Sequence, residues 1–144
     1  MTISPSQNYN AEVFDEFAVF LEGIGFPSGA GRLIVYLMIC EPIRQSASDI
    51  QHALGMSVGS VSANIKILRA LGTVKMSTVP GDRRRYYYID DSSWKSVYDA
   101  RILQLRKAIQ VLDKVEARGG KNSRITALRS MYTNFLDAME KLSV

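Results

Sequence analysis

Hydrophobic residues in the first forty positions recur at helical spacing. From Asn10 onward they fall three or four residues apart, which predicts an amphipathic helix that ends near Pro27. The positions of its apolar stripe are Val13, Phe17, Phe20 and Ile24, with Phe14 and Leu21 widening it. The next stretch, about residues 28–40, is apolar on nearly every side, so we expect a second helix, capped by Ser28, at the buried centre.

Two shorter helical patterns follow, with a glycine between them. Ser46 and Asp49 have the spacing of a capping box, which predicts a short helix over 46–54 that ends at Gly55. A further helix is expected over 58–70. Its inward-facing positions are Val61, Ile65 and Leu68. Two helices joined by a tight glycine turn form a helix-turn-helix corner, which by itself is a common arrangement.

The hydrophobic period then changes from helical to extended. Residues 74–79 and 84–89 alternate or are rich in β-forming residues. Between them, Pro80, Gly81 and Asp82 supply the chemistry of a turn. We therefore expect a β-hairpin directly after the helix-turn-helix corner.

Two long helices are expected at the end of the sequence, separated by Gly119 and Gly120, with Asn122 or Ser123 as the cap of the second. Their apolar seams are Tyr98, Ile102, Leu105, Ile109 and Leu112, and then Ile125, Leu128, Tyr132, Phe135, Met139 and Leu142. These seams are too long to be buried by the small domain that precedes them, so they favour association between helices of two chains. An intramolecular helical hairpin that covers the core is the alternative.

Length and composition are those of one globular domain with a helical extension. The sequence has 144 residues, 47% hydrophobic and 22% charged, which excludes a wholly disordered or fibrous chain. We expect a flexible N-terminus at 1–9, a folded domain with an N-terminal helix at 10–92, and a C-terminal helical region for dimerisation at 93–144.

Membrane, secretion and metal signals are weak or missing in the sequence. The longest apolar run, 33–40, is far shorter than the ~20 residues that a membrane-spanning helix needs. The N-terminus lacks the layout of a secretory signal, and a single cysteine, Cys40, fits a reducing compartment, so we expect a cytoplasmic protein with no membrane partner. Cys40 and His52 are the only soft metal ligands, so we expect neither a metal nor a cofactor.

Charge is distributed unevenly along the sequence. Residues 1–43 carry one basic and five acidic residues, whereas residues 44–87 carry seven basic and two acidic residues. A basic segment attracts polyanions, and duplex DNA presents a dense line of phosphates. A solvated, slightly basic surface is the alternative on charge alone.

The helix, glycine turn, helix and basic hairpin together have the layout of a winged helix-turn-helix domain. The fold class we expect is therefore mainly α-helical with a small β-hairpin wing, and with N- and C-terminal helices for dimerisation. In the second helix of the corner, Gly59, Ala63 and Lys66 lie opposite the inward stripe, with Ser60 beside them. Small side chains let a helix approach the major groove, where Ser60 and Lys66 reach base edges. Ser57 at the helix start and Ser62 on its flank suit phosphate contacts, unless these serines only cap and fill.

The expected wing carries three consecutive arginines, Arg83, Arg84 and Arg85. Because side chains alternate along a strand, the three do not all face DNA. We expect one of them to pair with Asp82 or anchor the hairpin, while the others contact a phosphate or the minor groove. The tyrosines at 86–88 are expected to pack against the recognition helix, with base stacking as the alternative.

At this point the sequence resembles the MarR-type winged-helix regulators, and most of all their GbsR-like branch. The resemblance rests on Gly31-Arg32, Ser48-Asp49-Ile50, Leu54-Gly55-Met56-Ser57, Gly59-Ser60-Val61-Ser62, Leu68-Arg69-Ala70-Leu71-Gly72 and Gly81-Asp82-Arg83-Arg84. It implies a homodimeric transcription factor, usually a repressor, that binds pseudo-palindromic double-stranded DNA and is often released by a small-molecule effector. In the family, terminal helices form the dimer interface.

The seams and the resemblance together select the expected dimerisation residues. These are Val13, Phe17, Phe20, Ile102, Leu105, Ile109, Leu112, Leu128, Tyr132, Phe135 and Met139. The sequence has no paired carboxylates, nucleophile set or metal cluster that would indicate an enzyme, so no catalytic residue is expected. The alternatives to a sequence-specific regulator are a winged-helix dimer that serves as a protein-interaction module and a nonspecific nucleic-acid binder.

Overall fold

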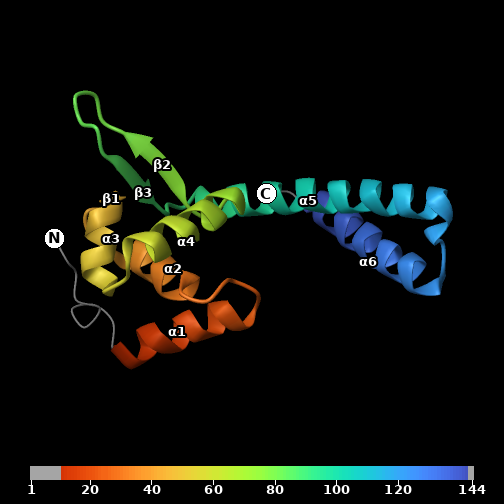
Figure 1. The fold of residues 1–144 in the computed structure, drawn as a ribbon, viewed down its shortest axis with the longest axis horizontal. Helices are drawn as coiled ribbons and strands as arrows, with labels where there is room; N and C mark the ends of the chain where they lie inside the picture. Colours follow the sequence, from red (N-terminus) through yellow and green to blue (C-terminus); the bar gives the residue numbers. More distant parts are fainter. Residues whose placement is uncertain (1–10, 143–144) are drawn as a thin grey trace. The chain divides into compact units, whose positions relative to one another are not determined.

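The computed structural model describes residues 11–142, so the expected flexible segment 1–9 lies outside the described residues. The fold is mainly helical with a small antiparallel sheet (Figure 1), and the expected winged-helix class is confirmed. The elements in chain order are α1 Ala11–Gly23, α2 Ala30–Ile39, β1 Gln45–Ser46, α3 Ala47–Leu54, α4 Val58–Ala70, β2 Lys75–Thr78, β3 Arg85–Tyr88, α5 Ser93–Val115 and α6 Ser123–Glu140. Contacts divide the chain after Trp94 into two compact units, the winged-helix unit and the C-terminal unit.

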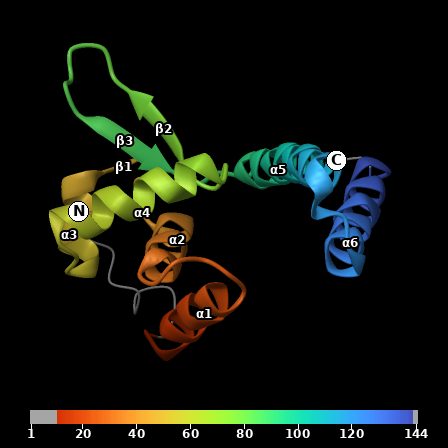
Figure 2. The same ribbon diagram turned by 45° about the vertical axis from the view of Figure 1, so that its right-hand side comes forward.

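Helix α2 is the centre of the winged-helix unit, as its uniformly apolar sequence predicts. It contacts α1, α3, α4 and β3, and Leu33, Ile34 and Leu37 are almost fully buried. Burial of each such side chain stabilises the fold by about 1.5–3 kcal/mol. Figure 2 shows α1 packed against α2 on the side away from the hairpin.

The start of α2 differs from the sequence-based expectation. Gly29, not Ser28, occupies the cap position, with a φ of 86° that favours glycine. As a glycine, it has no side chain that could accept a hydrogen bond from the first turn of α2. Instead, the Gly29 backbone N–H donates to Glu22 Oε1 of α1 at 3.2 Å. The prediction that Ser28 caps α2 was wrong, because the Glu22 carboxylate of α1 binds the backbone at the start of α2 instead.

The helix-turn-helix corner forms as its capping residues predict. Ser46 Oγ accepts from the Asp49 N–H at 3.1 Å, and Asp49 Oδ2 accepts from the Ser46 N–H at 2.9 Å, which completes the capping box of α3. Gly55 ends α3 with a φ of 64°. Ser57 then caps α4, because its Oγ accepts from the Ser60 N–H.

The sheet has three strands in the order β1-β3-β2, all antiparallel. The hairpin of β2 and β3 matches the prediction, with Met76 opposite Tyr87. The two-residue strand β1 was not predicted. It is held by a buried polar pair, in which the Tyr36 hydroxyl donates to Gln45 Oε1 at 2.7 Å. Burial raises the pKa of Tyr36 to about 12, so this hydroxyl stays protonated as the donor.

The C-terminal unit consists of α5 from Lys95 onward, a tight turn and α6. Residues Glu116–Gly120 form the turn, where Gly119 has a φ of 92°, so the predicted glycine break is confirmed. Asn122, one of the two expected caps, is the one used, because its Oδ1 accepts from the N–H groups of Arg124 and Ile125. Ion pairs of Arg129 with Asp113 and of Arg106 with Glu140 join α5 to α6.

The contact between α1 and α2 depends on a residue without a side chain. A Cβ atom at Gly31 would lie 2.2 Å from the carbonyl oxygen of Ala18, which is backbone and has little freedom to move. Gly31→Ala is therefore expected to lower the free energy of unfolding by about 1–3 kcal/mol, despite the better helix propensity of alanine. Urea denaturation followed by circular dichroism measures the change.

Gly23→Ala is the matched control for this substitution. Gly23 also lies in a helix, but no neighbouring atom lies within 4 Å of the Cβ position that an alanine would add. The control is expected to unfold at the wild-type urea concentration or slightly above it. Equal stability of the two variants would contradict the close packing of α1 on α2.

Candidate nucleic-acid interface

Helix α4 presents the small, exposed face that the sequence predicts for a recognition helix. Val61, Ile65 and Leu68 are buried on the other side, so the inward stripe is confirmed. The residues of the outer face are Gly59, Ser60, Ser62, Ala63 and Lys66, of which only Ser60 is partly covered. No atom lies within 4 Å of a Cβ at Gly59. The beginning of α4 is therefore open to close approach by another surface.

Two polar residues that sequence reasoning missed hold the helix-turn-helix corner. Asn64 is buried in α4, and its Nδ2 donates to the Ser60 carbonyl oxygen at 2.9 Å. Arg32 of α2 donates from Nη1 to the carbonyl oxygen of Leu54, the last residue of α3, at 3.2 Å. Arg32 thus binds the negative end of the α3 dipole. The sequence signal for it was the basic residue in an otherwise apolar helix.

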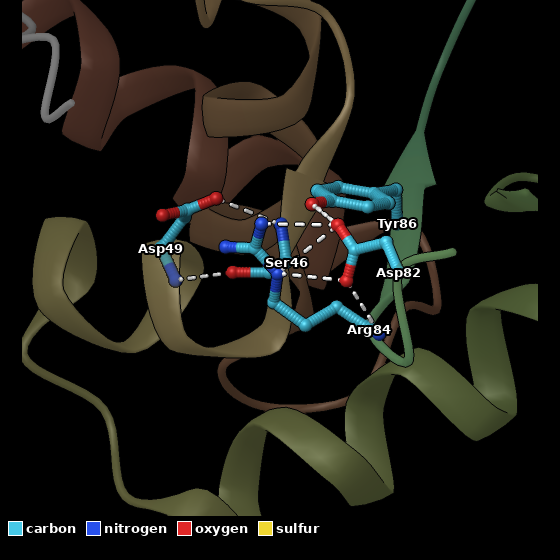
Figure 3. A network of polar contacts seen from close by, with 5 residues as sticks. All are labelled: Ser46, Asp49, Asp82, Arg84 and Tyr86. Atoms are coloured by element: carbon cyan, nitrogen blue, oxygen red, sulfur yellow. Dashed lines mark hydrogen bonds and ion pairs between the residues drawn. The ribbon is translucent and has the colours of Figure 1, made fainter. Parts of the chain in front are cut away.

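A network of polar contacts fixes the base of the wing turn. Figure 3 shows the Asp82 carboxylate between Arg84 and Tyr86, beside the capping box of Ser46 and Asp49. Arg84 donates to both carboxylate oxygens, from Nε at 3.1 Å and from Nη2 at 3.0 Å. The Tyr86 hydroxyl donates to Oδ2 at 2.6 Å, and the Arg84 backbone N–H donates to Oδ1 at 2.9 Å. Of the three wing arginines, Arg84 is the one that pairs with Asp82.

These contacts shift the pKa values of the groups involved. Hydrogen bonds from Arg84 and then from Tyr86 hold the pKa of the Asp82 carboxyl well below its usual range. The same bonds raise the pKa of Arg84 and of Tyr86. At neutral pH the wing turn therefore contains a carboxylate and a guanidinium that are both charged and held together.

The other two wing arginines lie differently. Arg83 and Arg85 are exposed, and neither side chain makes a hydrogen bond or ion pair with any part of the chain that the structure describes. Arg85 lines a cavity between α4 and β3 together with Ser62, Lys66 and Arg69. Arg83 and Arg85 also line a neighbouring cavity beside the start of α3. The structure thus brings the predicted residues of α4 and of the wing together on one unit.

The strand tyrosines and a further arginine stabilise the wing instead of lying free. Of the three tyrosines predicted to pack inward, Tyr87 packs against the hydrophobic core, whereas Tyr86 contacts Asp82 of the wing turn. Tyr88 lies under the guanidinium of Arg44, whose Cζ is 4.6 Å from the ring centroid. Arg44 Nε also donates to the Ser77 hydroxyl of β2 at 3.1 Å. Arg44 therefore contributes to the wing structure as well as to the positive charge of this segment.

Within their own units, five of the eleven expected dimerisation residues are exposed, four are half-buried and two are buried. In α1, Phe14, Ala18 and Leu21 face the core, while the side chains of Val13, Phe17 and Phe20 are 51%, 42% and 59% exposed. In α5, Leu105 and Leu112 are buried, and Ile102 and Ile109 are half-buried. No described residue of α6 is buried: Leu128 and Phe135 are exposed, and Tyr132 and Met139 are half-buried.

Cys40 and His52 have structural surroundings. Cys40 is buried in the core, and burial raises the pKa of its thiol to about 11. His52 is exposed, with Nδ1 2.7 Å from the Ser48 carbonyl oxygen one turn earlier in α3. Within residues 11–142 no group of three or more metal-ligating side chains occurs. In the same range, no helix is both long and apolar enough to cross a membrane.

Comparison with known proteins agrees with this fold. The chain is 28% identical, over 102 residues, to the HTH-type transcriptional regulator MmpR5 of Mycobacterium tuberculosis. The match covers 71% of this chain and 62% of MmpR5, so it spans less than two thirds of that relative. No family model matches the chain.

Solved structures give the same class of fold. A crystal structure of a transcriptional regulator superposes with a TM-score of 0.78 at 24% identity, covering 90% of this chain and 92% of the other. MepR, a transcription regulator of the Staphylococcus aureus multidrug efflux pump MepA, covers similar shares at 16% identity, but its TM-score of 0.47 is too low to support an argument.

The architecture is the winged-helix fold, which this chain shares with a solved transcriptional regulator. The predicted resemblance to the MarR type is confirmed, whereas the GbsR-like branch is not supported by any of these comparisons.

The Asp82 network leads to a measurable pKa. In a ¹³C NMR titration, the Asp82 carboxyl is expected to titrate well below the usual aspartate pKa of about 3.9, because Arg84 and Tyr86 stabilise its charged form. Since this pKa is depressed, the network contributes stability above the usual aspartate pKa and loses it as the pH falls through the lowered value.

Two variants separate the contributions of Arg84 and Tyr86 to the lowered pKa of Asp82. Arg84→Ala is expected to bring the Asp82 midpoint most of the way back to the usual value, and Tyr86→Phe part of the way, because the bonds from Arg84 are the larger cause. A wild-type midpoint near 4 would show that the network does not form in solution.

Proposed function

We propose that this chain is a sequence-specific, double-stranded DNA-binding transcriptional regulator that acts as a homodimer. The observation that carries the proposal is the shared placement, on one unit, of the exposed small-residue face of α4 and an arginine-rich wing. The likeness to transcriptional regulators supports it.

In this proposal α4 enters the major groove. Gly59 and Ala63 allow the helix to come close, and Ser60 and Lys66 contact base edges. The N-terminus of α4 with Ser57, and Ser62 on its flank, lie against the phosphate backbone. Ser57 Oγ already accepts the Ser60 N–H, so its remaining hydroxyl proton is the group it offers to a phosphate.

The wing contributes through Arg83 and Arg85, which contact phosphates or the minor groove. Arg84 shares this surface, but its guanidinium is held by Asp82 and orders the wing turn. If about six phosphates are neutralised per dimer, the slope of log affinity against log salt is about −5.

Dimerisation is proposed through α1, α5 and α6. The support is the exposed apolar surface of α1 and the absence of any buried residue in the described part of α6, which leave apolar side chains exposed on both helices within their own units. Two copies related by a two-fold axis would present two recognition helices to an inverted repeat.

Repression and release by an effector extend the proposal. A dimer seated on promoter DNA blocks access to it, which favours a repressor. An apolar cavity of about 310 Å³ lies between α1 and α2, lined by Phe14, Phe17, Val35 and Met38 among others. This is room for a small apolar molecule at a surface that we assign to the dimer.

The test is selection of bound duplexes from a random DNA pool at near-physiological salt. We expect enrichment of an inverted repeat whose half-sites are spaced by one helical turn, about 10–10.5 base pairs, or a multiple of it. Salt-sensitive binding without enrichment would support a nonspecific binder instead. No binding at low salt would favour a protein-interaction module.

Lys66→Ala sharpens this test, because Lys66 is the longest side chain on the outer face of α4. The variant is expected to relax the preference at one position of each half-site, which corresponds to about 1–3 kcal/mol of discrimination. Lys107→Ala, a change of an exposed lysine on α5, is the control and is expected to select the wild-type sequence. Identical selections by both variants would contradict the placement of Lys66 at base edges.

A further inference from the structure

The cavity between the recognition helix and the wing, here called the α4–β3 cleft, collects positive charge. It has a volume of about 280 Å³. Its polar wall consists of Ser62, Lys66 and Arg69 of α4 and of Arg85 of β3, and Ile65 and Tyr87 are among its other lining residues. All of these residues lie in the winged-helix unit.

Backbone periodicity explains why these side chains meet. Residues 62, 66 and 69 are spaced four and three apart, so they form one stripe along α4 beside the buried stripe. Arg85 and Tyr87 are two apart on β3 and share a face of the strand. Because Tyr87 packs against the core, it turns Arg85 toward α4. Arg84 is held by Asp82 and does not line the cleft.

The positive charges of the cleft are not balanced by the protein. The lining residues include no carboxylate. The side chains of Lys66, Arg69 and Arg85 form no ion pair or hydrogen bond with any residue from 11 to 142. By contrast, Lys75 and Arg84 of the same hairpin are paired with Asp90 and Asp82. Three like charges around one cavity repel each other, and an anion between them removes that repulsion.

The donors match the chemistry of a phosphate. Two guanidinium groups offer N–H donors in a planar fork that suits phosphate oxygens, and the Ser62 hydroxyl adds another donor. The apolar side chains of Ile65 and Tyr87 limit the water that competes for these donors.

We propose that the α4–β3 cleft binds one phosphate group of the DNA backbone, with Arg69 and Arg85 as its principal ligands. This inference rests on the proposed function and adds Arg69 to the interface. A phosphate held at once by the recognition helix and the wing fixes the angle at which α4 enters the groove. In the sequence, Arg69 had only the signal of a basic residue in the last turn of a helix.

The test compares Arg69→Gln, Arg85→Gln and the control Arg101→Gln, an exposed arginine on α5, by fluorescence anisotropy on a duplex that the wild type binds. Each cleft variant is expected to weaken binding roughly 10-fold, and to make the salt slope less steep by about 1 per protomer. The control is expected to match the wild type. Thermal melts monitored by circular dichroism confirm that each variant is folded.

Methylphosphonate scanning locates the phosphate itself. One neutral linkage in each half-site is expected to weaken wild-type binding about as much as the cleft variants do, and to have little further effect on the Arg69→Gln, Arg85→Gln double variant. Wild-type affinity and salt slope in both single variants, with DNA binding intact, would overturn the inference while leaving the proposed function standing.

If the wild type binds no duplex at all, the proposed function fails, and a titration with inorganic pyrophosphate decides the cleft. In this titration the Nε–H NMR signals of Arg69 and Arg85 are followed together with that of Arg101. A shift of the first two signals without a shift of the third would support the cleft as a phosphate site that takes a free anion. Equal behaviour of all three arginines would overturn the site.

Discussion

Burial of α2 is the constraint on which the winged-helix unit depends. Helices α1, α3 and α4 and strand β3 all pack against it, so the position of the recognition helix and the position of the wing are set by the same apolar surface. The contact with α1 requires Gly31, where even a methyl group meets the backbone of the neighbouring helix. Arg32, the next residue, leaves this core to hold the end of α3. Packing and orientation of the candidate interface are therefore coupled through two adjacent residues.

Charge in the wing is divided between structure and function. Asp82 holds Arg84 and Tyr86 and so orders the turn, while alternation along the strand leaves Arg85 facing α4. If all three wing arginines were unpaired, the wing would carry more net positive charge, but no ion pair would order its turn. One internal ion pair thus gives the remaining cations a defined position relative to the recognition helix.

Much of the fold could be predicted from local patterns. The capping box of α3, the limits of α4 and the glycine break before α6 follow from spacing and from residues whose backbone preferences are strong. What could not be predicted depends on contacts between distant residues. Glu22 replaces Ser28 as the cap of α2, Gln45 joins the sheet through Tyr36, and Asn64 is buried in the face behind the recognition surface.

The candidate interface shows the same division. The sequence predicted that one arginine of the wing pairs with Asp82, but only the positions of the side chains identify Arg84. Arg69 was missed because it lines one cavity with Arg85 of β3, and no local sequence pattern encodes this juxtaposition.

The measurement that tests the account most directly is affinity cleavage of bound DNA from a single cysteine. Cys40 is only 4% exposed, with a thiol pKa of about 11, so an iron–EDTA reagent reacts with an introduced cysteine in preference to it. Ala63→Cys places the reagent on the outer face of α4, and Val19→Cys, on the exposed side of α1, is the control. The account predicts cuts centred on the major groove of each half-site from position 63 and none there from position 19. Cuts spread evenly along a bound duplex from position 63, or focused cuts from position 19 alone, would contradict it.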